Sequence, residues 1–213
     1  MMSKRGRPQG APDLSRRRFI IAGATASGTL LLGIPLTSFP SGENPSEGDG
    51  RIGFYIEVLE NGDVAVGHAQ PEIGQGLRTT LIMLVAEEMD LDWKRIRIEP
   101  MPLGIVKTAE GYTWKYGGQG VGGSTGLTNN WTYMREVGAT ARLMLMQAAA
   151  QLWNVPLSSC DTRPGVVVCE SAGKQATFGE LGKLASALPL PTEPPQLKPM
   201  DQYRIVGKPQ RNE

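Results

Sequence analysis

Hydrophobic and polar residues alternate along two neighbouring segments near residue 60, as they do in a half-buried β-hairpin. The alternating hydrophobic positions of the first segment are Ile52, Phe54, Ile56 and Val58. The second segment continues the pattern at Val64, Val66 and His68. Between them, Asn61-Gly62 can take positive φ at both turn positions. The stretch "WKRIRIEPM", residues 93–101, predicts a third strand with Ile96 and Ile98 facing inward.

Helical periodicity replaces this alternation in two longer segments. Apolar residues at spacings of three and four predict helices over residues 77–89 and 127–152, and the second ends before Pro156. Between them, residues 103–126 are expected to form a long glycine-rich connection without regular structure. A hairpin over 158–170 turns at Pro164-Gly165, and a short helix follows over 177–188. The pattern therefore predicts an α+β fold in which β-hairpins pack with two long helices.

The composition suits one domain with a modest core, because 40% of the 213 residues are hydrophobic and 20% are charged. We expect a signal and linker over residues 1–45, a folded domain over 46–188 and an extended Pro-rich tail over 189–213. Basic residues concentrate in the first 40 positions, and the rest of the chain has 16 basic and 20 acidic residues. A body with a net charge of −4 lacks a basic surface for phosphates, so nucleic-acid binding is not expected.

The beginning of the chain has the pattern of an export signal. The sequence Ser15-Arg16-Arg17-Arg18-Phe19-Ile20 leads into an apolar stretch from Phe19 to about Leu36, which indicates a twin-arginine signal and a periplasmic destination. A Sec signal and a short membrane anchor are the alternatives. No clean A-x-A site follows, so cleavage and retention at the inner membrane both stay open. The twin-arginine pathway carries folded proteins, often with a bound cofactor.

Two glycine-rich loops each run into the start of a predicted helix. The first, "EIGQG" at residues 72–76, contains Gly74, Gln75 and Gly76. The second, "YGGQGVGGSTG" at residues 116–126, contains Gly122, Gly123, Ser124 and Thr125. Free N–H groups and the helix dipole favour an anionic or carbonyl-rich ligand there, although Ser124 and Thr125 also suit plain helix caps. Neither loop has the lysine of a P-loop or the spacing G-x-G-x-x-G.

The stretch "PEIGQGLRTTLIMLVAEEMDLDWKRIRIE", followed by "GGSTGLTNNWTYMREVGATARLMLMQAAAQLW", resembles the molybdopterin-binding large subunit of the molybdenum hydroxylases, the xanthine oxidase family. The likeness runs from about Ile52 to Lys208. It is strongest for the exported branch, which includes the isoquinoline 1-oxidoreductase beta subunit and the membrane-bound aldehyde dehydrogenases of acetic acid bacteria. The E-[IM]-G-Q-G motif joined to the G-G-S-T helix start is fairly specific as a pair.

The resemblance implies that both loops hold the molybdopterin cytosine dinucleotide cofactor. Gly74 and Gln75, with Gly76, would lie at the pterin–molybdenum end, where the glycines admit the cofactor and the glutamine hydrogen-bonds it. The pterin or its phosphates would be held by Gly122, Gly123, Ser124 and Thr125. The acetic acid bacterial relatives have been labelled pyrroloquinoline-quinone enzymes, but nothing in this sequence supports a quinone site.

The resemblance also implies a larger assembly. In the family, a second region supplies a G-G-x-F-G loop and a late glutamate that acts as general base, and neither motif is found here. We therefore expect an N-terminal component with no identifiable catalytic residue, inactive alone, that shares its cofactor with a separate chain carrying the remainder. The implied reaction is oxidation of an aldehyde or N-heterocycle with water. The implied electron acceptors are a [2Fe–2S] subunit and then a c-type cytochrome or quinone, since two cysteines cannot hold such clusters here.

A different class of function is the alternative: a truncated, non-catalytic remnant, or an exported binding or assembly module. The sequence gives neither the substrate nor the origin of the short chain.

Several polar residues are interpreted as structural. His68, the only histidine, is expected at a polar rim without metal-ligand neighbours, and Glu72 as a cap of its loop. Glu87 and Glu88 are expected on the solvated side of their helix. The methionines expected to fill the core are Met134, Met144 and Met146.

Cys160 and Cys169 flank the Pro164-Gly165 turn at nearly mirror positions, with Thr162 expected opposite about Val166. An oxidising destination favours a disulfide between them. Folding in the reducing cytoplasm, or a shift of register by one residue, leaves two buried thiols. The sequence keeps both alternatives open.

Overall fold

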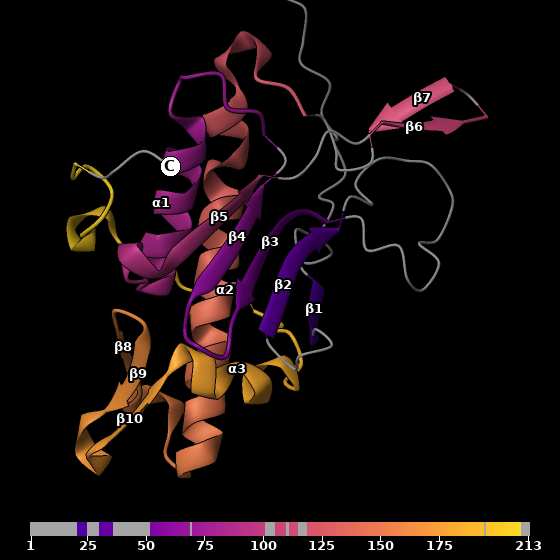
Figure 1. Cartoon of the computed structure of the whole chain (residues 1–213). Coiled ribbons are helices and arrows are strands. Elements are labelled where there is room, and N and C mark those ends of the chain that lie inside the picture. Colours follow the sequence, from indigo (N-terminus) through magenta and orange to yellow (C-terminus); the bar gives the residue numbers. More distant parts are fainter. Residues whose placement is uncertain are drawn as a thin grey trace, which may run out of the picture.

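The computed structural model describes residues 21–24, 30–35, 52–68, 70–100, 105–109, 111–114, 119–193 and 195–209. These residues form a five-stranded sheet with helices packed against it and two smaller sheets (Figure 1). The predicted α+β class is therefore confirmed. The twin-arginine motif lies outside the described residues.

The large sheet has the strand order β1-β2-β3-β4-β5. Its strands are β1 (Ile21–Ala24), β2 (Leu30–Pro35), β3 (Ile52–Val58), β4 (Val64–His68) and β5 (Ile96–Pro100). Neighbouring strands are antiparallel except β4 and β5, which are parallel. A parallel pair needs a crossover connection, which α1 (Leu77–Met89) supplies. The predicted β3–β4 hairpin and third strand are confirmed, and the crossover is a feature that the periodicity did not indicate.

Two strands of this sheet come from the apolar stretch that the sequence predicts to be a signal. β2 pairs with β3, which places Leu30 opposite Val58 and Leu32 opposite Ile56. Leu30 is only 1% exposed and belongs to the core. Small and apolar residues are common both in β-strands and in signal sequences. Composition alone therefore does not distinguish a strand from a signal. The sheet therefore extends before residue 46, the expected start of the domain.

The two long helices, α1 and α2 (Gly126–Trp153), pack side by side and run in the same direction (Figure 1). At their first turns, a Cβ added to Gly126 would lie 2.6 Å from Leu77 Cδ2. Further along, a Cβ added to Gly138 would lie 2.9 Å from the carbonyl oxygen of Val85. A third helix, α3 (Phe178–Ser186), packs against α2 and the first strands of the sheet. The predicted helices are thus confirmed, and the N-termini of α1 and α2 lie next to each other.

Two small sheets complete the fold. β6 (Ile105–Thr108) and β7 (Gly111–Trp114) form a hairpin inside the connection that was expected to lack regular structure. The other sheet has the order β10-β9-β8, formed by β8 (Asp161–Arg163), β9 (Val166–Cys169) and β10 (Lys174–Thr177). The hairpin at Pro164-Gly165 is confirmed, although Thr162 faces Val167 rather than Val166. Single 3-10 turns cover Trp93–Arg95, Gly122–Ser124, Leu157–Ser159, Glu170–Ala172 and Met200–Gln202.

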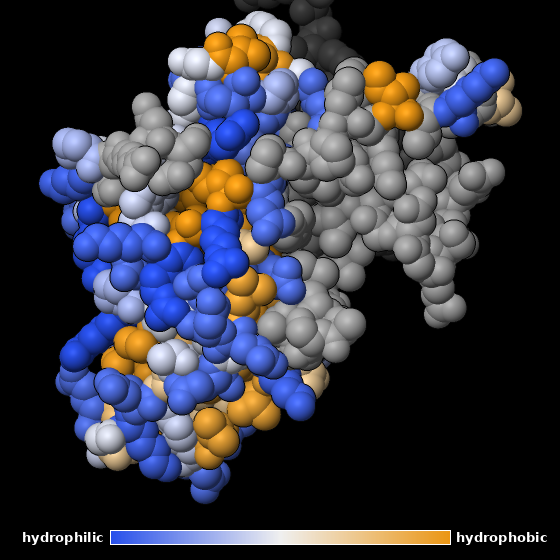
Figure 2. Space-filling model, in the orientation of Figure 1, coloured by the Kyte–Doolittle hydropathy of each residue, from blue (hydrophilic) through white to orange (hydrophobic). Residues whose placement is uncertain are grey.

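The hydrophobic core lies between the large sheet and the helices. Met134 and Met144 are buried in it and Met146 packs against it, which confirms their predicted role. The coloured part of the face in Figure 2 is mainly hydrophilic, and its hydrophobic side chains form separate patches. Within the part of the chain that the structure describes, no helix combines the length and apolar character needed to cross a bilayer.

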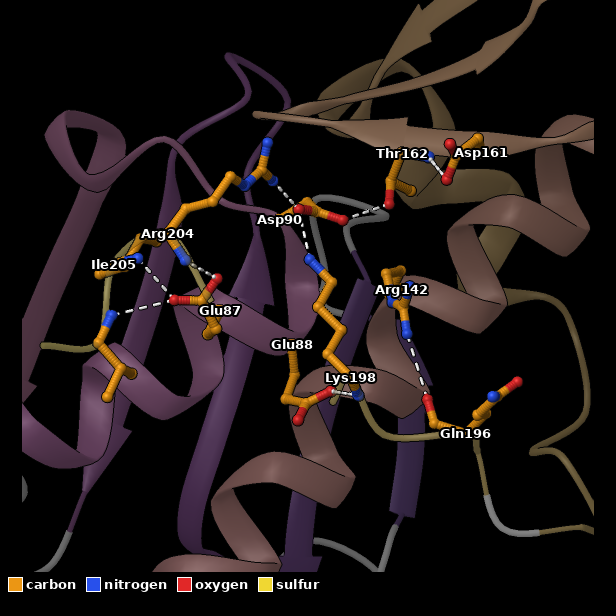
Figure 3. Close-up of polar contacts among 11 residues, drawn as sticks. Glu87, Glu88, Asp90, Arg142, Asp161, Thr162, Gln196, Lys198, Arg204 and Ile205 are labelled. Carbon is orange, nitrogen blue, oxygen red and sulfur yellow. Dashed lines mark hydrogen bonds and ion pairs between the residues drawn. The ribbon is translucent and has the colours of Figure 1, made fainter. Parts of the chain in front are cut away.

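Three buried carboxylates near the end of α1 bind the C-terminal segment (Figure 3). Glu87, 1% exposed, accepts backbone hydrogen bonds of 2.8, 2.6 and 3.0 Å, whose donors are Arg204, Ile205 and Val206. Glu88, 0% exposed, accepts from Arg135 Nε at 2.7 Å and from the Lys198 backbone N–H at 2.9 Å. Asp90 contacts the side chains of Thr162, Lys198 and Arg204.

The prediction that Glu87 and Glu88 are solvated is therefore wrong. Their side chains lie on a face of α1 that the segment 195–209 covers. A buried carboxylate is tolerated when hydrogen-bond donors satisfy its oxygens, and this segment supplies backbone N–H groups and cationic side chains. Helical periodicity marks such positions as polar and does not show that a distant part of the chain covers them.

Candidate functional site

The structure brings the two predicted loops to the same end of the helix pair. The loop at residues 72–76 leads into α1 at Leu77, and the loop that ends at Thr125 leads into α2 at Gly126. Leu77 and Gly126 are in contact, because a Cβ added to Gly126 would lie only 2.6 Å from Leu77 Cδ2. Two parallel helices therefore present their N-terminal N–H groups, and the positive ends of their dipoles, side by side.

The loop before α1 is organised by the carboxylate of Glu72. Its Oε1 accepts from the backbone N–H groups of Gly74 at 2.8 Å and Gly76 at 3.1 Å, and its Oε2 accepts from the N–H of Arg78 at 3.0 Å. These hydrogen bonds hold the pKa of the Glu72 carboxyl below its usual value, and the bond from the Arg78 N–H has the largest effect. The predicted cap is thus confirmed, and the chain supplies its own anion to the start of α1.

Gln75 is exposed and closes a small ring within this loop. Its Oε1 accepts from the Ile73 N–H at 2.7 Å, and its Nε2 donates to the Pro71 carbonyl at 3.2 Å. Gly74 and Gly76 have φ of 97° and 74°, values that favour glycine, and no described atom lies within 4 Å of a Cβ built on either. Within the described residues, the glycines are therefore needed for backbone conformation rather than for close packing.

The loop before α2 is more open. Gly122–Ser124 form a 3-10 turn in which Gly123 and Ser124 have positive φ, and residues 122–125 are exposed. No side chain of the described residues caps the start of α2. The hydroxyl of Thr125 donates to the Gly122 carbonyl at 3.1 Å, and its oxygen accepts no hydrogen bond from the first turn of α2. The plain-cap alternative for Ser124 and Thr125 is not what the structure shows.

The two helix starts consequently differ in electrostatics. An intramolecular carboxylate occupies the start of α1, whereas the start of α2 keeps first-turn N–H groups without a side-chain cap in the described part of the chain. A bound anion is favoured where N–H groups and the dipole are not already neutralised. Of the two helix starts, the one at α2 is therefore the less neutralised by side chains of the described residues.

His68 lies at the end of β4 and is only 3% exposed, so its expected place at a polar rim is wrong. Neither ring nitrogen makes a hydrogen bond of ordinary geometry with a described residue, although the backbone of Gln70 lies close enough to favour the charged ring. Burial lowers the pKa of the His68 imidazole, and the charge of Arg78 acts in the same direction; the backbone of Gln70 and the charge of Glu72 oppose them. Strand alternation could have indicated this burial, since His68 continues the inward positions Val64 and Val66.

Other candidate chemistry is sparse in the described residues. They contain no group of three or more His, Cys, Asp or Glu side chains arranged to hold a metal ion. Cys160 and Cys169 are both buried free thiols. Burial, and then the neighbouring Cys169, raise the pKa of the Cys160 thiol.

The chain is similar in sequence to several known proteins. Residues 13–213 match the molybdopterin cofactor-binding domain. The chain is 32% identical over 170 residues to isoquinoline 1-oxidoreductase subunit beta from Brevundimonas diminuta, covering 79% of this chain and 22% of that protein. It is 27% identical over 216 residues to membrane-bound aldehyde dehydrogenase [pyrroloquinoline-quinone] from Gluconacetobacter polyoxogenes, covering 97% and 26%. The CO dehydrogenase of Oligotropha carboxidovorans matches with a TM-score of 0.47 and 21% identity, over 67% of this chain and 17% of that one.

The match to the family model extends over nearly the whole chain. The chain belongs to the molybdopterin cofactor-binding domain family. It spans about a quarter of the length of the two curated relatives named above.

Proposed function

We propose that this chain is a component of the large subunit of a molybdenum hydroxylase and holds part of its molybdopterin cofactor. The observation that carries this proposal is the contact between Leu77 and Gly126, which sets two glycine-rich helix starts side by side. Family membership supports the same cofactor. When bound, the cofactor supplies two-electron oxidation chemistry in which water provides the oxygen.

The residues present fit such a group. The uncapped start of α2, with residues 122–125 exposed before it, suits the phosphates, because its N–H groups have no side-chain cap in the described residues. The loop at Gly74, Gln75 and Gly76 suits an uncharged part of the cofactor, since Glu72 already neutralises the start of α1. Gln75 would exchange its two hydrogen bonds within the loop for bonds to the cofactor. We propose the cytosine dinucleotide form.

The proposed assembly includes further chains. The remainder of the large subunit would complete the cofactor site, and a [2Fe–2S] subunit would pass electrons to a c-type cytochrome or quinone. We propose an aldehyde or an N-heterocycle as substrate, because the relatives named above are an aldehyde dehydrogenase and an isoquinoline oxidoreductase. The chain alone would be inactive.

We also propose export to the periplasm through the twin-arginine motif, with peripheral association with the inner membrane. The apolar stretch after the motif contributes β1 and β2, so we propose that it is retained rather than cleaved. Replacing Arg16 and Arg17 with lysine tests the address. Cytoplasmic retention of the variant is expected, and unimpaired export would refute the assignment.

The function is tested by co-production with the polypeptide that carries the remainder of the large subunit. Molybdenum, pterin and dye-linked oxidation of aldehydes and N-heterocycles are expected in the complex and not in the isolated chain. Gln75→Ala is expected to lower pterin content or turnover, since losing a hydrogen bond to a buried partner costs about 1–3 kcal/mol. Gln151→Ala, an exposed position near the other end of α2, is the control. A complex without molybdenum would favour a non-catalytic binding or assembly module.

A further inference from the structure

A buried ion pair joins α1 to α2. Glu88 of α1 is 0% exposed, and its Oε1 accepts from Arg135 Nε of α2 at 2.7 Å. Arg135 Nη2 donates to the Lys198 carbonyl oxygen at 2.6 Å, and the Lys198 N–H donates to Glu88 Oε2 at 2.9 Å (Figure 3). The ring of Tyr203 lies 5.6 Å from the guanidinium carbon of Arg135. The C-terminal segment thus closes the ion pair into a triangle of hydrogen bonds.

The same glutamate fits a notch in α2. A Cβ added to Gly138 would lie only 3.1 Å from Glu88 Cβ, so the missing side chain makes room for the glutamate stem. Arg135 precedes Gly138 by three residues and therefore lies on the same face of α2. Gly138 is the only glycine of α2 after its first residue. The notch and the ion pair consequently require one and the same register of α1 along α2.

This contact distinguishes the correct register from a shifted one. Most buried side chains of the two helices are apolar, and apolar side chains tolerate an exchange of neighbours. A shift by one helical turn, about 5.4 Å, would instead separate the Glu88 carboxylate from Arg135 and from the notch. A buried charge without a partner is strongly unfavourable, and the best-attested use of buried polar groups is to fix register in this way.

The register also sets where the two glycine-rich loops meet. Leu77 begins α1 and Gly126 begins α2, so a shift along the helix axes would move one loop past the other by the same distance. We propose that Glu88 and Arg135 are positioning residues for the site formed by these loops, because they hold α1 and α2 in a single register. The link to a cofactor rests on the proposed function, whereas the register itself does not.

The register is tested by the distance between the loops in the full chain. Nitroxide labels on cysteines at the exposed positions Ile73 and Thr128 report this distance by pulsed EPR, and the two native thiols are buried. Glu88→Met combined with Arg135→Met replaces the ion pair by apolar side chains, a change that buried pairs often tolerate. One narrow distance is expected in the wild type, and an additional population shifted by about 5 Å, one helical turn, in the double variant.

Two controls separate register from stability. Glu87→Gln weakens the hold on the C-terminal segment without touching α2 and should keep the single distance. Arg135→Lys preserves the charge opposite Glu88 and should also keep it. A single wild-type distance in the folded double-Met variant would overturn the proposal. If that variant does not fold, Glu88→Gln removes only the charge and is expected to broaden the distance distribution; an unchanged distribution would then overturn the proposal.

The consequence for the site is measured in the complex with the remainder of the large subunit. Turnover of the double-Met complex is expected to fall about tenfold relative to Glu87→Gln, because a small displacement of binding groups weakens catalysis strongly. Wild-type turnover and molybdenum content despite a shifted loop distance would overturn the positioning role and leave the proposed function intact. A wild-type complex without molybdenum would overturn the proposed function, while the EPR result would still decide the register.

Discussion

Gly138 of α2 lies directly against the backbone of Val85 in α1. A Cβ at position 138 would be 2.9 Å from the Val85 carbonyl oxygen and 3.1 Å from Glu88 Cβ. A helix backbone cannot move aside as the end of a flexible side chain can. The two helices must therefore separate to make room for a methyl group. We expect Gly138→Ala to lower the free energy of unfolding by roughly 1–3 kcal/mol, despite the higher helix propensity of alanine. Urea denaturation measures the change.

Gly182 provides the matched control, since it is also a helical glycine. In α3, the nearest atoms to a Cβ at this position are 3.6 Å away, which is ordinary contact. Gly182→Ala is therefore expected to be neutral or to stabilise by up to about 1 kcal/mol. Equal stabilities of the two variants would show that the helix contact at Gly138 is looser than described.

The carboxylate of Glu87 is expected to hold the C-terminal segment in place. Glu87→Gln keeps the side-chain shape, but one oxygen becomes an NH₂ group that faces a backbone N–H of Arg204, Ile205 or Val206. We expect a loss of about 1–3 kcal/mol and faster amide exchange at these three residues. Hydrogen exchange read by mass spectrometry resolves the segment 195–209 from the rest of the chain.

Glu170→Gln is the control for this variant. Glu170 also accepts from an arginine, Arg163, but their side chains are 78% and 61% exposed. An exposed ion pair contributes little, so stability should change by less than about 1 kcal/mol. Similar losses in both variants would mean that burial does not distinguish Glu87.

Local patterns predicted the elements that depend on near neighbours in the chain. The helices beginning at Leu77 and Gly126 and the hairpin turn at Asn61-Gly62 follow from periodicity and turn chemistry. Features that depend on distant partners were not predictable in this way. Burial of Glu87 requires a segment more than 100 residues later, and the pairing of β2 with β3 requires strands separated by a linker. The identity of a polar residue on a helix does not show whether a distant segment covers it.

The candidate site was predictable in part for the same reason. Glycines before a helix identified both loops, and their meeting at Leu77 and Gly126 depends on the parallel packing of α1 and α2. The difference between the two helix starts depends on which way the Glu72 side chain turns, and sequence spacing does not fix that. His68 was missed because a lone histidine at a strand end is usually a surface residue.

Removing the charge of Glu72 should make the start of α1 more attractive to anions. Glu72→Gln leaves the helix dipole without its carboxylate, and we expect pyrophosphate to bind about two- to fivefold more tightly. Glu180→Gln is the matched control, because Glu180 accepts from the Thr177 N–H at the start of α3, away from the loops. Both variants should lose some stability, but only the first should gain affinity. Unchanged pyrophosphate binding in Glu72→Gln would contradict the neutral assignment of the first loop.

Burial of His68 should make stability sensitive to mild acid. Its pKa is lowered from 6.5 in the folded chain, so the unfolded chain binds the proton more readily. Stability is therefore expected to fall as the pH drops below about 6.5, with a slope of at most about 1.4 kcal/mol per pH unit, until the folded ring is protonated too. His68→Gln should remove this dependence. Urea midpoints of the two proteins from about pH 7.5 to about pH 5 test it, and parallel curves would refute it.

Cys160 and Cys169 should remain thiols in the folded protein. The β8–β9 register pairs Asp161 with Val168, so Cys160 and Cys169 each lie one residue beyond this pair. Both side chains are buried, however, and burial raises the pKa of the Cys160 thiol. Since the thiolate is the form that reacts, oxidation and alkylation should both be slow in the native state. Mass spectrometry of periplasmic protein is expected to show no alkylation by iodoacetamide until the chain is unfolded, and then two alkylated cysteines without any reductant. Two cysteines that stay unmodified after unfolding, and become reactive only on reduction, would show that the bridge forms.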